Sequence, residues 1–139
     1  MATVGRGDIR TALQGAGCQL LEHLQVVLPQ IMMVRSSGIL LQGPCHPGEK
    51  VPRPVQHAQG LARYFREEIK RGRLAMSSPD TYAHAFLGSL SHYVFCETLF
   101  NYRPAAPRAY VRTVVDAIVK ATAVPGASGR GRKGKRVVR

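Results

Sequence analysis

The chain has 139 residues, of which 45% are hydrophobic, and this suits one globular domain with a single core. It has no run of about 18 apolar residues, which argues against a transmembrane helix and a membrane partner, and residues 1–7 lack the apolar segment of a signal peptide. The three cysteines are widely spaced, which argues against a disulfide framework and predicts a cytoplasmic protein.

The first predicted element is an amphipathic helix over residues 8–27, after a short lead-in over 1–7. Asp8 is suited to cap its first turn, because a carboxylate accepts a hydrogen bond from a free backbone N–H group. Pro29 is then expected to end this helix and to begin a second one over 29–41. The apolar positions of the first helix recur at helical spacing on one face: Ile9, Leu13, Ala16, Leu20, Leu24 and Val27.

A segment rich in proline and glycine over 42–53 predicts a loop before the remaining helices. The clearest helix start is Ser78-Pro79-Asp80, which provides an N-cap, a proline in the first turn and an acidic side chain there. No segment has the alternating pattern of a β-strand, so the sequence predicts an all-α fold with five helices. The last three predicted helices cover 54–73, 78–101 and 105–123.

The predicted helix over 78–101 has two usable faces. One is broad and apolar, and the other carries a stripe of small or short side chains that would let a second helix approach closely. His92 and Cys96 are four residues apart in this stripe and could hold a metal ion, but helix packing is the favoured interpretation. The stripe consists of Ala85, Ser89, His92 and Cys96.

Catalytic and cofactor motifs are absent from the sequence. It contains no nucleotide-binding glycine motif, no zinc-protease motif and no nucleophile elbow. Cys45 and His46 are adjacent, but no further metal ligand follows at a suitable spacing. We therefore expect no enzyme activity, no cofactor and no metal site.

The C-terminal tail over 124–139 is basic and is expected to be disordered. Residues 120–139 hold seven of the 20 Lys and Arg residues and no acidic residue. Such a tail can contact DNA weakly by releasing counterions, but it has no aromatic residue to stack on bases. A solubilising tail and an accidental extension are the alternatives.

Several segments resemble the C-terminal domain of TetR-family transcriptional regulators. They include Leu61–Ile69, Gly72-Arg73-Leu74 and Ser78-Pro79-Asp80, then Ala85–Leu90 and Ala109–Val119. Residues 8–34 are similar to the first helices of the same domain, so the resemblance covers most of residues 8–123. It implies an all-helical domain that senses a small effector and pairs with a second copy.

In this family the last two long helices of each subunit form a four-helix dimer interface, and the ligand cavity lies among the earlier helices and the penultimate helix. The resemblance therefore implies an interface built from 78–101 and 105–123. The candidate interface residues are Ala85, Ser89, His92, Cys96, Val111, Val115 and Ile118. The predicted helix faces offer these candidates for lining a cavity for a small hydrophobic effector: Leu20, Met32, Met33, Phe65, Phe86 and Tyr93.

The family also has an N-terminal helix-turn-helix domain that reads DNA, and this sequence has no room for one before residue 8. We therefore expect an effector-sensing and dimerisation domain that contacts DNA only indirectly or through its tail. Three origins remain open: a truncated form of a longer regulator, a natural remnant, and a protein that uses its tail for weak DNA contact. The alternative function is an interaction module that forms mixed dimers with a full-length regulator.

Overall fold

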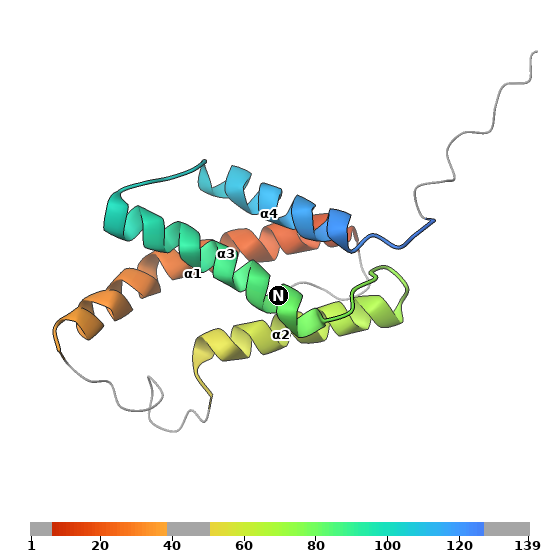
Figure 1. Cartoon of the computed structure of the whole chain (residues 1–139), viewed down its shortest axis with the longest axis horizontal. Helices are drawn as coiled ribbons and strands as arrows, with labels where there is room; N and C mark the ends of the chain where they lie inside the picture. The colour runs from red at the N-terminus through yellow and green to blue at the C-terminus, as the bar shows by residue number, and fades with distance from the viewer. Residues whose placement is uncertain (1–6, 39–50, 127–139) are drawn as a thin grey trace, which may run out of the picture.

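The computed structural model describes residues 7–38 and 51–126, and every regular element within these ranges is a helix. Figure 1 shows their arrangement. None of these helices is long and apolar enough to cross a membrane. The described part of the chain therefore has four helices, which confirms the all-α prediction but not the number five. They are α1 (Ile9–Ser36), α2 (Arg53–Lys70), α3 (Pro79–Phe100) and α4 (Pro107–Ala121).

The difference in helix number arises at Pro29, which lies inside α1. The prediction that Pro29 would end one helix and begin another was wrong. Proline lacks the N–H group for one backbone hydrogen bond and costs about 3 kcal/mol in a helix interior. Here Leu24 and Leu28, just before the proline, pack on the core, and this burial offsets part of that cost. Residues 39–41 of the expected second helix lie outside the described residues.

The other helices lie within a few residues of their predicted bounds. The predicted caps are confirmed, because the Asp8 carboxylate accepts a hydrogen bond from Thr11 N at 3.1 Å and Ser78 Oγ accepts one from Thr81 N at 3.4 Å. These bonds satisfy N–H groups that have no partner within the helix. The Asp8 bond also lowers the pKa of its carboxyl group.

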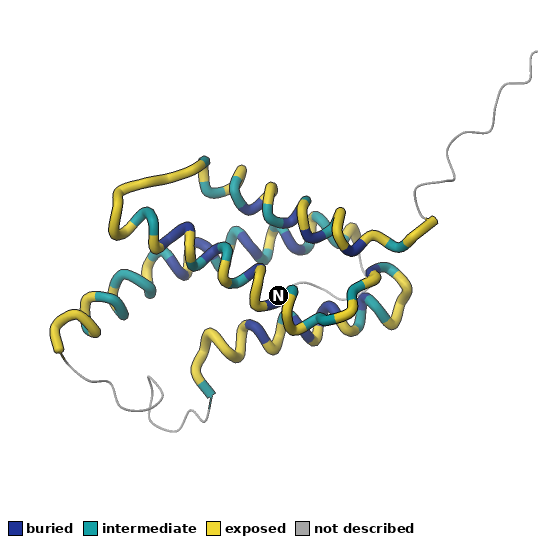
Figure 2. Tube along the Cα trace, in the orientation of Figure 1, coloured by how far each residue is buried: buried dark blue, intermediate teal, exposed yellow. Residues whose placement is uncertain are grey.

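Helix α3 is central, because it packs against each of the other three helices (Figure 1). Helix α1 packs on α3 and α4, whereas α2 packs on α3 and makes no comparable contact with α1. The buried residues line the inner sides of the helices, as Figure 2 shows. The largest fully buried apolar side chains are Leu13, Leu21, Phe65, Phe86, Leu90 and Tyr93.

Gly17 allows α1, α3 and α4 to meet closely. A Cβ atom at this position would lie 2.7 Å from Val111 Cγ1 and 2.9 Å from Phe86 Cζ. Both distances are shorter than side-chain carbons tolerate, so only glycine fits without displacing its neighbours. The position of the Phe86 ring, which also borders the site described below, therefore depends on Gly17.

Candidate ligand-binding cleft

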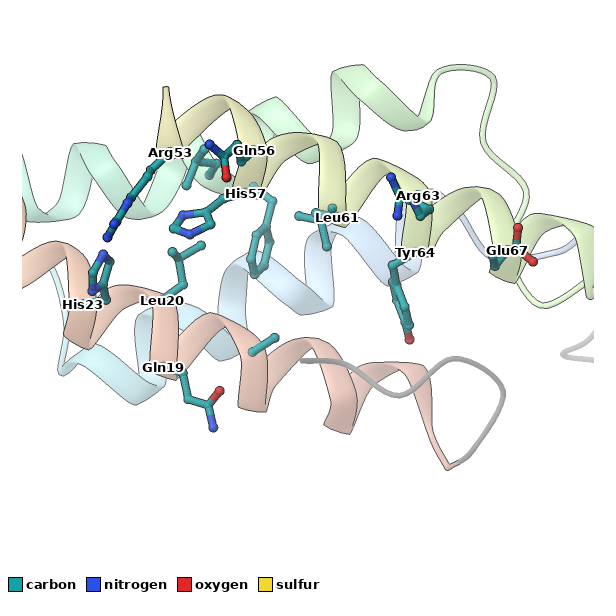
Figure 3. A pocket seen from close by; sticks show the side chains of 14 residues that line it. Gln19, Leu20, His23, Arg53, Gln56, His57, Leu61, Arg63, Tyr64 and Glu67 are labelled. Carbon is teal, nitrogen blue, oxygen red and sulfur yellow. The ribbon is translucent and has the colours of Figure 1, made fainter. Parts of the chain in front are cut away.

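Because α1 and α2 pack on α3 but not on each other, a cleft lies between them. It has a volume of about 630 Å³, and α3 contributes Phe86 and Leu87 to its lining. Figure 3 shows its side chains. We call it the α1–α2 cleft, and it has an apolar surface formed by Ala16, Leu20, Leu61, Phe86 and Leu87.

Polar side chains from both helices border the α1–α2 cleft. The His23 ring of α1 lies edge-on to the His57 ring of α2, with ring centroids 6.0 Å apart. Glu67 is hydrogen-bonded by Lys70 Nζ at 2.9 Å, and this bond is the main reason that the pKa of Glu67 is lowered. The polar lining residues are Gln19, His23, Arg53, Gln56, His57, Arg63 and Glu67.

Tyr64 also lines the cleft, and its hydroxyl group is buried without a hydrogen-bond partner within the described residues. The residue is only 6% exposed. Burial, followed by the negative charge of Glu68, raises the pKa of the phenol. Folding therefore favours the neutral phenol, and this contribution to stability is lost as the pH rises through the raised pKa.

Next to Tyr64, a buried ion pair connects the end of α2 with the entry to α1. The Glu68 side chain is 0% exposed and accepts a hydrogen bond from Arg73 Nε at 2.5 Å. Arg73 also donates through Nη1 to the backbone oxygen of Gly7 at 2.9 Å. One guanidinium group thus contacts both the last turns of α2 and the residue just before the N-cap of α1.

The residues predicted to line a ligand cavity fall into three groups. Leu20 and Phe86 line the α1–α2 cleft. Phe65 and Tyr93 lie in the core, where Tyr93 donates a hydrogen bond to Ala105 O at 2.8 Å. Met32 and Met33 lie near the end of α1, outside the cleft lining, and Met33 is 67% exposed.

Sequence reasoning missed the polar part of the cleft. Gln56 and Arg63 belong to the polar side of α2, which the sequence pattern assigns to solvent. The structure places this side at the mouth of an open cleft, where a polar residue can be hydrated and still border a ligand. In the sequence, His23 and His57 could have indicated a polar border to the cleft. They lie on different helices, however, and their proximity depends on the packing of both helices on α3.

The residues predicted to form a dimer interface separate into two sets. Val111, Val115 and Ile118 are buried in the chain's own core, where α4 packs on α1. The stripe on α3 instead faces outward, since Ala85 and His92 are exposed and Ser89 and Cys96 are partly exposed. Cys96 Sγ lies 3.5 Å from His92 Nε2, but no group of three metal-binding side chains occurs within residues 7–38 and 51–126.

The outer stripe of α3 continues onto α4. Tyr110 Oη donates a hydrogen bond to Ser89 O at 3.0 Å and so joins the two helices. By helical periodicity, the same side of the pair also carries exposed residues of α4. We call this surface the α3–α4 face; it consists of Ala85, Gly88, Ser89, His92, Phe95, Cys96, Leu99, Thr113 and Ala117.

These features define an all-helical domain with an open cleft between α1 and α2 and an uncharged outer face on α3 and α4. Residues 49–123 match the family model described as the AefR-like transcriptional repressor C-terminal domain, a TetR-family domain. The chain therefore belongs to the TetR family of transcriptional regulators. C-terminal domains of this family are regulatory rather than enzymatic, which is consistent with the expectation of no enzyme activity. No curated protein and no solved structure matches the chain.

Proposed function

We propose that this domain binds a small, largely apolar effector in the α1–α2 cleft and pairs with a second copy through the α3–α4 face. The observation that carries the proposal is the cleft itself. Its volume of about 630 Å³ falls within the range typical of small-molecule sites. Its mainly apolar surface, with polar groups at the border, is the usual composition of such a site.

The position of the cleft supports a role in signalling. A ligand between α1 and α2 would contact two helices that both pack on α3. Binding would favour one spacing of these helices over another, and a ligand shifts an equilibrium only through such differential contacts. The Glu68–Arg73–Gly7 contacts connect the far end of α2 with the start of α1, so a change in α2 would reach the N-terminal end of the domain.

The composition of the α3–α4 face supports pairing. It contains no Lys, Arg, Asp or Glu, although the chain carries a net charge of +12. Phe95 is 41% exposed and Leu99 is 51% exposed, and interfaces are depleted of charge and enriched in such residues at their centres. Gly88 and Ala85 would allow a second copy of α3 to approach closely. A mixed dimer with another regulator of the family would use the same face.

Filling the cleft is expected to abolish effector binding while leaving the fold intact. Gly60 lines the cleft, and a Cβ atom there meets nothing within 4 Å. The variant Gly60→Phe would place its ring in the cleft and weaken binding of a neutral naphthylamine dye at least roughly tenfold, as measured by dye fluorescence. Gly15→Phe is the matched control, because Gly15 is also helical and open but does not line the cleft. Equal dye binding by the two variants would place the apolar site elsewhere.

A charge on the α3–α4 face is expected to convert dimers to monomers. Gly88 is exposed and has open space around it within one chain, so Gly88→Arg should fold normally. In a dimer the two arginines would face each other and remain unpaired, which costs several kcal/mol at an interface. Light scattering coupled to size-exclusion chromatography should give a monomer mass for Gly88→Arg. Gly15→Arg, the control, should keep the dimer, and a dimer in both variants would assign pairing to another surface.

A further inference from the structure

We infer that the effector carries an uncharged oxygen acceptor, such as a carbonyl group, which receives a hydrogen bond from the hydroxyl group of Tyr64. The inference rests on the proposed function, because it assigns the chemistry of the molecule that the α1–α2 cleft binds. It follows from a buried donor at the border of the cleft that has no partner within residues 7–38 and 51–126.

Tyr64 is held in place by the packing of α2. It belongs to the core cluster and is only 6% exposed, and its ring lies at a tilt to the Phe65 ring, with centroids 6.0 Å apart. Tyr64 nevertheless lines the cleft together with Leu61, and Figure 3 shows its side chain extending from α2 toward α1. The phenol is therefore fixed beside the apolar surface on which an effector would lie.

The lack of a partner distinguishes Tyr64 from two other tyrosines that pack in the core. Tyr93 Oη donates a hydrogen bond to Ala105 O at 2.8 Å, and Tyr110 Oη donates one to Ser89 O at 3.0 Å. Buried phenol hydroxyl groups usually have such a partner, because an unpaired polar group lowers the stability of the folded state. An accepting atom on a bound molecule would supply the partner that the described part of the chain does not.

The charges around Tyr64 favour an acceptor without a charge. Burial and the negative charge of Glu68 raise the pKa of the phenol, so the hydroxyl group keeps its proton at neutral pH and can donate it. Glu67 and Glu68 follow Tyr64 by three and four residues, and a helix brings such positions to one side. Lys70 and Arg73 bond to these carboxylates, but an anionic ligand would still add a third negative charge beside them. A carbonyl oxygen accepts the hydrogen bond without this repulsion.

Three naphthalenes that differ in a single substituent test the acceptor. Acetylnaphthalene carries a carbonyl group, isopropenylnaphthalene has a methylene group in place of the carbonyl oxygen, and naphthoate carries an anionic carboxylate. Their Kd values would be measured by displacement of the neutral naphthylamine dye. Because the three molecules differ in hydration, each is compared between the parent protein and Tyr64→Phe, which removes only the hydroxyl group.

The loss of affinity should be confined to the ketone. We expect acetylnaphthalene to bind Tyr64→Phe roughly tenfold more weakly than the parent, because its buried oxygen loses its donor. Isopropenylnaphthalene should bind both proteins equally, and naphthoate should bind the parent more weakly than the ketone does. Tyr82→Phe is the matched control, since Tyr82 is half-buried on α3 and does not line the cleft. It should bind all three molecules as the parent does.

Thermal unfolding without ligand tests the unpaired hydroxyl group directly. Tyr64→Phe should melt at or above the temperature of the parent, because it removes a buried donor that has no partner. A clear decrease in the melting temperature would show that the hydroxyl group already has a partner in the free protein, and would overturn the inference.

The binding results separate the inference from the proposed function. A ketone affinity that is unchanged in Tyr64→Phe would overturn the hydrogen bond but leave the apolar cleft intact. Equal weakening of the ketone and the alkene would show a distorted cleft rather than a lost hydrogen bond, and would also overturn it. Naphthoate that binds more tightly than the ketone and depends on Tyr64 would contradict the uncharged acceptor. Failure of the dye and all three molecules to bind would count against the proposed effector-binding function itself.

Discussion

Replacing Gly17 by valine is expected to lower the free energy of unfolding by about 1–3 kcal/mol, because it overpacks the point where three helices meet. The added Cβ would lie 2.7 Å from Val111 Cγ1 and 2.9 Å from Phe86 Cζ. Both neighbours are fully buried, and the Val111 side chain is short and stiff at χ1. Neither can move without displacing other core residues. Thermal and urea unfolding followed by circular dichroism would measure the loss.

Alanine provides a graded test of the same contact. At an open helical position, replacing glycine by alanine stabilises a protein by about 0.5–1 kcal/mol. Gly15, in the same helix and with nothing within 4 Å of its Cβ, should show this gain. Gly17→Ala should instead be neutral or destabilising, since the gain in helix propensity is opposed by the clash. Stabilisation of equal size at both positions would show that the three helices approach less closely in solution.

The Gly17 contact also affects the proposed site. Phe86 lies against Gly17 and lines the α1–α2 cleft. A valine at position 17 would push the Phe86 ring toward the cleft and reduce its volume. Gly17→Val should therefore weaken dye binding as well as stability, whereas Gly15→Ala should leave dye binding unchanged. A core contact and a ligand site are coupled here through one aromatic ring.

Local sequence signals were sufficient to predict where a helix begins when its first turn has a strong cap. Ser78-Pro79-Asp80 fixed the start of α3 within one residue, because side-chain capping and the proline act within a single turn. Pro29 led to a wrong prediction because its effect depends on tertiary packing. A proline inside a helix has a fixed local cost, but Leu24 and Leu28 contact the core formed by distant parts of the chain.

The cleft was harder to predict than the helices. Periodicity identifies the apolar face of a helix but not the element that covers it. Val111 and Ile118 lie on a broad apolar face, and such a face suits a core as well as a dimer interface. In the structure α4 packs on α1, and both side chains are buried in the core of the chain. Leu20 and Phe86, two of the candidate lining residues, border the cleft, whereas His23 and Arg53 were not among the candidates because they lie on polar faces. The predicted basic tail beyond residue 126 lies outside the described residues.

Replacing Arg73 by methionine is expected to lower the melting temperature by roughly 10 °C, because it removes a charge partner from a buried carboxylate. The Glu68 side chain is 0% exposed, and Arg73 donates to it at 2.5 Å. Without this bond the carboxylate retains its cost of desolvation but loses a compensating interaction. The contact of Arg73 with Gly7 O is lost as well, which loosens the start of α1.

Two further variants separate this ion pair from a general effect of charge. Arg71→Met removes an exposed arginine only two residues away and should change the melting temperature little. The double variant Glu68→Met with Arg73→Met removes both charges, and buried pairs replaced by apolar side chains often lose little stability. It should therefore melt above Arg73→Met alone. If Arg73→Met and Arg71→Met melted at the same temperature, the pair would contribute nothing, and the proposed connection between the cleft and the start of α1 would lose its physical basis.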